Sequence, residues 1–275
     1  MKSPALLIAR QEFVLNRRNK WVASFAVLFA VLTFAISYFG MVTSGYSGFQ
    51  DFARTSTSLI KLSGFLIPLF SLLLGVFSFI SHREYLELMI AQPVSRREVI
   101  LGKYLGLGLT LFGSTVIGFT VPGVLISLAV GTEGALGYAL IVLFSILLGF
   151  VFIGCSILIS QVSNRQQIAL GVAVGVWIFF EMIYGLLILG TTIYLSADVL
   201  RYALLFGLLG NPIDIVRVVS LIAVGGLEFF GPAGATLFKL AGSQWSALAY
   251  GIAGLIVWIA LPLLIALRRF SKQNL

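Results

Sequence analysis

Six long apolar runs constrain this chain more than any other feature of its sequence. A hydrocarbon core of roughly 30 Å needs about 20 helical residues to cross it, and each run is of that order. Of the 275 residues, 59% are hydrophobic and only 10% are charged, whereas a soluble domain carries roughly 25% charged residues. A soluble body of this size has too little interior for all six runs. We therefore predict an all-α integral membrane protein with a single transmembrane domain over residues 1–275. The predicted spans are 21–42, 62–80, 104–130, 137–160, 168–189 and 245–267.

The distribution of Lys and Arg predicts how these spans are oriented. Short cytoplasmic connections of membrane proteins carry an excess of basic residues. Of the 18 Lys and Arg residues, 13 fall in the N-terminal arm 1–20, the connections that follow the second and fourth spans, and the C-terminal tail. Both termini are therefore predicted to be cytoplasmic, in a multi-pass protein of the cell inner membrane. The net charge of +8 then reflects membrane topology, and no nucleic-acid partner is expected.

The connection 190–244 joins the fifth and sixth spans on the opposite side. It is too apolar for a disordered linker, and charged residues interrupt it too often for a span. We predict extracytoplasmic helices that are interfacial or re-entrant. Pro212 follows Asn211, an order that suits the start of a helix.

The predicted spans contain little that could support intramembrane chemistry. Glu181 is the clearly ionisable residue within them, and the sequence shows no partner for it. A carboxyl bonded to a neighbouring helix and a group lining a pathway or gate both remain open. Met41 and Met182 could line a pathway and offer soft sulfur to Cu(I), although Met in a span is usually a packing residue. No metal site is predicted, and Cys155 is interpreted as a small core residue. A membrane-embedded enzyme is the weakest alternative, because it would need paired polar groups.

A nucleotide-binding site is also missing from the sequence. The pattern G-x-x-x-x-G-K-[ST] does not occur, since Tyr104 follows the Gly-Lys pair of "LGKYLG". An ion-coupled carrier would commonly show repeated halves with charged or broken helices, and no convincing repeat is found. The favoured energy source is a partner ATPase that binds ATP and Mg, and no cofactor is expected in this chain.

The cytoplasmic connection 81–103 concentrates the charges of its region. "HREYLELMIAQP" predicts a short amphipathic helix that carries Glu84 and Glu87 and ends at Pro93. A second helix starts beyond Val94, where Ser95 and Glu98 have the spacing of a capping box. A rigid helix–turn–helix at the membrane surface is the consequence, and a plain amphipathic connector is the alternative.

Glycine recurs within the spans at spacings that allow close helix contacts. Gly102 with Gly106, Gly171 with Gly175, and the pair of Gly149 and Gly154 are the main examples. We interpret all three as ordinary packing within one chain rather than as a seam between two copies.

Several of these segments resemble the ABC type-2 permeases. "LELMIAQPVSRREVILGKYLG" is similar to the segment that follows the second span in that family, where it forms a coupling helix that docks on the ATPase. "LLIARQEFVLNRRNKW" is similar to the interfacial helix that precedes the first span. "LLGNPIDIVRVV" and "FFGPAGATLFK" resemble the NosY-like branch, the membrane subunits of an exporter that serves copper-site assembly in nitrous oxide reductase. The compact "SHREYLE" departs from the acidic, glycine-containing run that the family often has there.

The resemblance implies a six-helix ABC type-2 (type V) exporter permease that works as a homodimer with two copies of a separate ATPase. It also implies an extracytoplasmic accessory protein, contact with membrane lipid, and a sulfur- or copper-related cargo. The alternatives are an exporter of a drug, lipid or peptide, and a mechanotransmitter that remodels a periplasmic partner without solute flux. The implied ATPase-coupling residues are Arg10, Glu12, Glu84, Glu87, Pro93, Val94, Ser95, Arg96, Arg97 and Glu98. The implied surface for the extracytoplasmic partner comprises Asn211, Pro212, Asp214, Arg217 and Glu228.

Overall fold

A computed structural model describes residues 3–44, 49–80, 94–130, 135–163, 165–225 and 231–272. Every regular element within these ranges is helical, as the sequence predicted. The helices are α1 (Pro4–Arg17), α2 (Lys20–Ser44), α3 (Phe49–Ile80), α5 (Arg96–Val130), α6 (Ala135–Val162), α7 (Gln166–Ile178), the π-helical segment η1 (Phe179–Ile183), α8 (Tyr184–Tyr194), α9 (Ala197–Leu209), α10 (Pro212–Val224), α11 (Gly231–Ala241) and α12 (Gln244–Lys272).

Six helices within the described part of the chain are long and apolar enough to cross a membrane, which confirms the predicted fold class. The helices extend beyond the apolar runs, most of all in α3, which begins at Phe49 rather than near residue 62. Thr55, Ser56 and Ser63 lower the hydropathy of its first half, yet all three are buried between helices. A hydropathy average scores each residue by its transfer to lipid, so polar residues that face protein lower the average even though they lie within a span.

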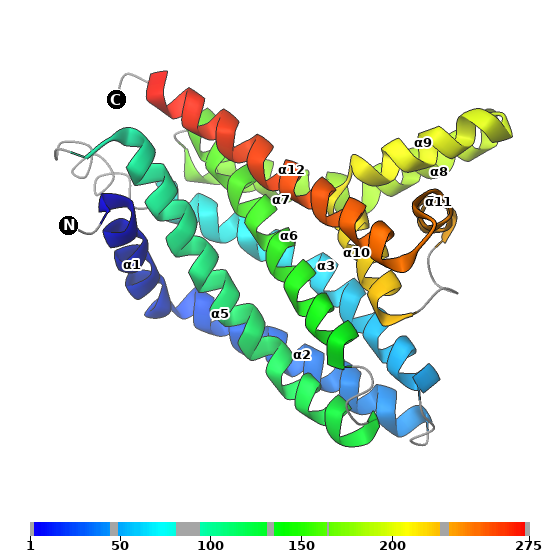
Figure 1. Ribbon diagram of the computed structural model, residues 1–275. Helices are drawn as coiled ribbons and strands as arrows, with labels where there is room; N and C mark the ends of the chain where they lie inside the picture. Colours follow the sequence, from blue (N-terminus) through cyan, green and yellow to red (C-terminus); the bar gives the residue numbers. More distant parts are fainter. Residues whose placement is uncertain are drawn as a thin grey trace.

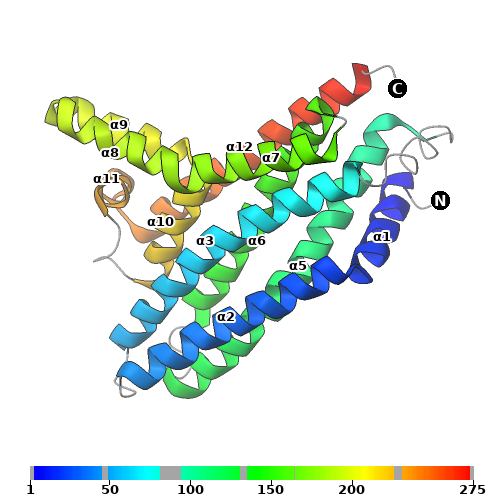
Figure 2. The ribbon, with the colours of Figure 1, turned by 180° about the vertical axis from the view of Figure 1, so that it is seen from behind.

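The helices form a bundle in which both termini lie at the same end (Figures 1 and 2). α2 and α5 run side by side along one edge of the bundle, and α1 packs against the first part of α5. Below, "the terminal end" means this end, formed by α1, the end of α3, the start of α5 and the end of α12. α5 begins at Arg96 and continues without a break to Val130. The second half of the predicted coupling segment is therefore part of a span.

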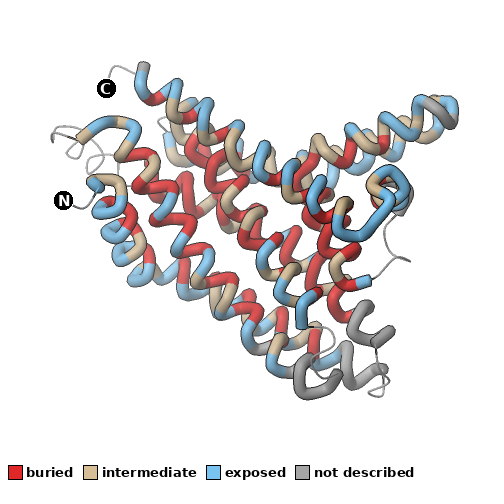
Figure 3. Tube along the Cα trace, in the orientation of Figure 1, coloured by how far each residue is buried: buried red, intermediate tan, exposed pale blue. Residues whose placement is uncertain are grey.

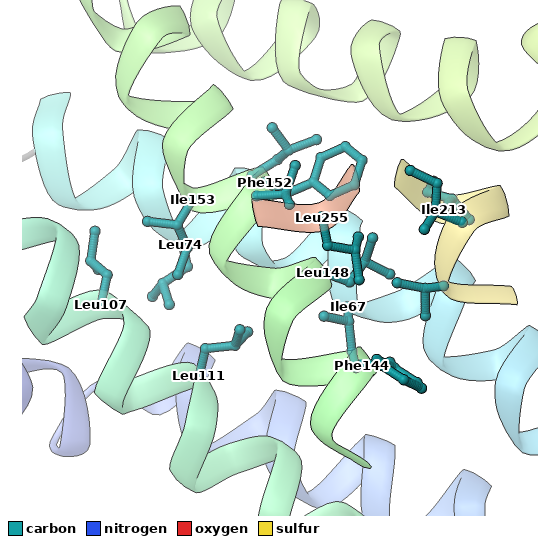
Figure 4. Close-up of a cluster of buried hydrophobic side chains, with 14 of the residues drawn as sticks. Ile67, Leu74, Leu107, Leu111, Phe144, Leu148, Phe152, Ile153, Ile213 and Leu255 are labelled. Carbon is teal, nitrogen blue, oxygen red and sulfur yellow. The ribbon is translucent and has the colours of Figure 1, made fainter. Parts of the chain in front are cut away.

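α6 lies at the centre of the bundle. It packs against α3, α5, α10 and α12, and its Phe144, Leu148 and Phe152 are fully buried. Their side chains meet Ile67 of α3 and Leu255 of α12 in one continuous core (Figure 4). Burial is concentrated on the inward faces of the helices, whereas the outward faces remain exposed (Figure 3). Many of the exposed side chains are large and apolar, among them Val27 and Leu187, as expected for a bundle whose outer surface faces lipid rather than water.

The connection between the last two spans turns back into the bundle. α9 and α10 meet at an angle of 100°, and α10 packs against α3, α6 and α12. Ten of the 13 residues of α10 are buried. The sequence left interfacial and re-entrant placements open for this region, and the burial of α10 favours the re-entrant one. As predicted, the helix starts at Pro212, with Asn211 as its N-cap.

The fifth span combines α7, η1 and α8 and contacts the rest of the chain sparsely. Only 6% of the most apolar stretch of this span is buried. Ala169 and Ala173 are the buried residues of α7. Beyond η1, α8 pairs with α9 in a hairpin that projects away from the bundle (Figures 1 and 2). Tyr194 at the tip of this hairpin is 88% exposed.

Candidate coupling site at the terminal end

α1 is an amphipathic helix whose buried face rests on α5. Ile8, Ala9, Glu12 and Asn16 are its buried residues. Two glycines of α5 allow the close approach: a Cβ at Gly102 would lie 2.6 Å from the Ile8 Cβ, and one at Gly106 would lie 2.7 Å from the Ala9 carbonyl oxygen. Real Cβ atoms do not approach other atoms so closely, so the two helices depend on glycine at both positions.

A buried ion pair fastens this contact. Lys103 Nζ lies 2.9 Å from Glu12 Oε2, and the two side chains are only 1% and 6% exposed. Ser78 of α3 donates to Glu12 Oε1, and Asn16 Nδ2 donates to the same oxygen over 3.0 Å. The Lys103 ammonium also lies 5.0 Å from the centre of the Phe79 ring. Charges are retained in an apolar interior only when they are paired and hydrogen-bonded. Here the pairing joins α1, α3 and α5 at one point.

The start of α5 is held by the capping box that the sequence predicted. Ser95 Oγ donates to Glu98 Oε2 over 2.7 Å, and the Ser95 backbone N–H donates to the same oxygen over 3.0 Å. In return, the Glu98 backbone N–H donates to Ser95 Oγ over 3.3 Å. These bonds satisfy N–H groups that have no partner within the helix. The first turn of α5 is therefore rigid where the chain enters the bundle.

The neighbouring residues Val94, Arg96 and Arg97 have different surroundings. Val94 packs against the small apolar cluster that Ile8 and Val99 form between α1 and α5. Arg96 is partly buried, and its Nη1 donates to the Phe270 carbonyl oxygen of α12 over 3.5 Å. Arg97 is exposed. Arg96 thus ties α5 to the C-terminal helix, whereas Arg97 is available to a partner.

The remaining predicted coupling residues divide into three groups. Arg10 is exposed on α1. Glu12 is buried, so it cannot meet a partner directly and instead holds α1 in place. Glu84, Glu87 and Pro93 lie outside the described residues.

Sequence reasoning missed Ser78, Asn16 and Lys103 as members of this site. The available signal was a lysine between two glycines at the start of an apolar run, since an isolated charge there needs a partner.

A second polar cluster lies where the fifth span meets the corner between α9 and α10. Arg217 Nη1 pairs with Asp214 Oδ1 at 2.8 Å, and its Nη2 lies 3.5 Å from Glu181 Oε1. Glu181 therefore has the partner that the sequence did not reveal, because the two residues lie 36 positions apart in the chain. Asn211 is buried and caps α10 by accepting from the Ile213 N–H over 3.0 Å.

Some residues predicted for the partner surface and the pathway are buried, and others are exposed. Pro212 is buried together with Asn211, so these two residues do not form a surface. Met182 is 59% exposed on η1. The Met41 side chain and Glu228 lie outside the described part of the structure. Among the described residues, no three His, Cys, Asp or Glu side chains come together as a metal site would require.

Two of the three glycine pairs pack within the chain, as predicted. Gly102 and Gly106 pack against α1. A Cβ at Gly149 would meet Leu111, and one at Gly154 would meet Pro262. Gly171 and Gly175 differ, because a Cβ at either position would meet nothing within 4 Å. The prediction of packing within one chain is therefore wrong for this last pair.

Comparison with known proteins places these features in a wider context. A family described as "ABC-2 family transporter protein" matches residues 6–275 of the chain. A protein of Stutzerimonas stutzeri named "Probable ABC transporter permease protein NosY" is 34% identical over 278 residues, which cover 97% of each chain. A protein of the same name from Pseudomonas aeruginosa is 33% identical over 258 residues, which cover 88% of this chain and 91% of its own. The family match covers most of α1 and all of α5.

Proposed function

Because the chain belongs to the ABC-2 family of transporter proteins and is a multi-pass permease subunit, we propose that it couples ATP hydrolysis by a separate cytoplasmic ATPase to work across the inner membrane. Its terminal end would face the cytoplasm, in keeping with the excess of Lys and Arg there. ATP and Mg would be bound by the ATPase, and this chain would contribute no cofactor.

The observation that carries the proposal is the buried joint between Glu12 and Lys103. It unites α1, α3 and α5 on either side of residues 81–93, the segment that the family resemblance assigns to ATPase docking. A push on that segment would act directly on the end of α3 at Ile80 and on the start of α5 at Arg96. Because the joint is rigid, the three helices would move together.

The exposed side chains near this joint are the candidates for direct ATPase contact. Arg10 and Arg97 are exposed on α1 and α5. Arg96 and Glu98 would instead keep α5 in position, through Phe270 and the Ser95 cap respectively. This division separates contact residues from positioning residues, which sequence reasoning grouped together.

A second copy of the chain is proposed to cover the fifth span. This span is sparsely packed within the chain, and Gly171 and Gly175 lie open on it. Small residues at this spacing allow two helix backbones to approach closely in a membrane. The pair is therefore a candidate seam between two copies.

We assign the work of the complex to copper-site assembly of nitrous oxide reductase. The support is the 34% identity with a relative named NosY and the likeness of residues 208–219 and 229–239 to that branch. An extracytoplasmic accessory protein is proposed to bind the exposed α8–α9 hairpin, where Tyr194 and Phe206 are 88% and 69% exposed, rather than the buried Asn211 and Pro212.

Co-purification with the ATPase tests the coupling role. Arg97→Glu should reduce recovery of the ATPase with the chain, because it reverses an exposed charge at the proposed contact. Arg201→Glu reverses an exposed charge on α9, away from the terminal end, and should leave recovery unchanged. Equal recovery and equal ATP turnover for the two variants would remove the docking assignment.

Reconstitution of the complex into vesicles separates the remaining alternatives. An exporter of copper- or sulfur-related cargo shows ATP-dependent flux of that cargo, whereas an exporter of a drug, lipid or peptide moves those instead. A mechanotransmitter shows ATP hydrolysis that depends on the extracytoplasmic partner and no flux.

A further inference from the structure

Arg217 of α10 lies between two carboxylates that belong to different parts of the fold. Its contact with Asp214, on the same helix, is short at 2.8 Å, and Asp214 also accepts from Asn211 Nδ2 over 2.8 Å. Its contact with Glu181, on η1, is longer at 3.5 Å. The guanidinium is therefore firmly held by α10 and more loosely by the fifth span.

Glu181 has a single charged partner within the described part of the chain. Its second oxygen, Oε2, is buried and accepts no hydrogen bond there, while the side chain is 13% exposed. If Arg217 moved away from Glu181, the carboxylate of Asp214 would still neutralise the charge of Arg217. Separation of η1 from α10 would therefore break this ion pair without leaving the guanidinium unpaired.

Neutral hydrogen bonds connect the same corner to two spans. The carbonyl groups at the end of a helix lack partners within that helix, and two carbonyls near the end of α9 receive side-chain donors from elsewhere. An η1 carbonyl receives a donor from the corner in return. The three bonds are Tyr184 Oη to the Gly207 oxygen, Trp258 Nε1 to the Leu209 oxygen, and Asn211 Nδ2 to the Phe180 oxygen, each 2.8 Å long.

The helix geometry at this point is unusual. η1 is a π-helical turn within a span, and such turns are frequently found at functional sites. Phe180 in η1 contacts the rings of Phe152 and Trp258 edge to face, at centroid distances of 6.0 and 5.6 Å. A register change in η1 would displace both the Phe180 carbonyl and the Glu181 carboxylate from α10.

We propose that the contact between Glu181 and Arg217 is a latch that holds the fifth span against the re-entrant helix α10. In the state described here the latch is closed. It opens when η1 moves relative to the α9–α10 corner, and Asp214 retains Arg217 while it is open. The driving force for opening rests on the proposed function, because it comes from ATP hydrolysis by the partner. The latch itself is a property of this chain.

Hydrogen–deuterium exchange on the full chain in lipid nanodiscs tests the latch without the ATPase. Glu181→Gln removes the charged contact and preserves the size of the side chain, so exchange in residues 212–224 should rise about tenfold while α6 stays unchanged. Arg217→Lys should do the same, because a compact ammonium lacks the planar, forked set of donors with which the guanidinium reaches two separate carboxylates. Arg201→Gln removes an exposed charge of α9 outside the latch, so it should change this exchange less than about threefold.

Unchanged exchange of residues 212–224 in both Glu181→Gln and Arg217→Lys would overturn the latch. Exchange that rises equally in α6 and α10 would also overturn it, because the contact would then support the whole fold rather than one joint. The same measurement with ATPase and ATP addresses the driving force alone. Failure of ATP to raise exchange in wild-type α10 would count against the coupling proposed above and leave the effect of Glu181→Gln in place.

Discussion

Glu12 and Lys103 lie 91 positions apart in the sequence, yet their charged atoms are 2.9 Å apart in the interior of the terminal end. The pair joins α1, the helix that precedes the first span, to the start of α5, the third span. Ser78 adds the end of the second span through its bond to the same carboxylate. Any movement of residues 81–93 would thus reach three helices at once.

Removal of one member of this pair should destabilise the protein strongly. Glu12→Gln leaves the Lys103 ammonium buried without its counter-charge, which costs about 3–5 kcal/mol of unfolding free energy. Unfolding in mixed detergent micelles measures this loss. The double variant Glu12→Gln with Lys103→Met should recover much of it, because no unpaired charge remains. Additive losses in the double variant would contradict a coupled pair.

Gly106 should not tolerate even a methyl group. In Gly106→Ala the new Cβ would lie 2.5 Å from the Glu12 Cβ and 2.7 Å from the Ala9 carbonyl oxygen. We expect a loss of about 1–3 kcal/mol from overpacking, together with displacement of α1. Gly113→Ala on the same helix is the matched control, since its Cβ would meet nothing within 4 Å. Equal unfolding curves for the two variants would show that α1 does not rest on Gly106.

The open glycines of the fifth span predict where two copies meet. Gly171→Leu should lower the dimer fraction measured by analytical ultracentrifugation in detergent, because a branched side chain would separate the two backbones at the seam. Gly113→Leu adds the same side chain at a position of α5 where a Cβ also meets nothing within 4 Å, and it should leave the dimer intact. The seam lies elsewhere if the two variants sediment alike.

Cysteine labelling tests the predicted orientation. In a Cys155→Ser background, Tyr194→Cys at the hairpin tip should react with a membrane-impermeant maleimide added to spheroplasts. Arg97→Cys should react only after the membrane is opened, because the basic terminal end is predicted to be cytoplasmic. Both native side chains are exposed, so differences in labelling report on sidedness. The reverse pattern would place the proposed ATPase contact outside the cell.

Features encoded by neighbouring residues could be predicted from the sequence. The Ser95–Glu98 capping box and the start of α10 at Pro212 both appear as expected, because each depends on side chains within one helical turn. Six spans were predictable because apolar length alone identifies them.

Features that depend on contacts between distant segments were not predictable. Lys103 appeared as a basic residue of a cytoplasmic connection, and only the packing of α1 on Gly102 and Gly106 brings Glu12 to it. The sequence left interfacial and re-entrant placements open for α10, and only the structure shows that the helix is buried and that Arg217 contacts Glu181. Periodicity gives the faces of a helix but not the element that each face meets.

If the terminal end of this chain receives force from a separate ATPase, the exposed side chain of Arg97 should contact that ATPase. A photo-crosslinking amino acid at the position of Arg97 should, in intact cells, give an adduct that mass spectrometry identifies as an ATP-binding-cassette ATPase. The same amino acid at the position of Arg201 should give none. The absence of an ATPase adduct from the first position, or its appearance only at the second, would show that the ATPase does not dock at the terminal end.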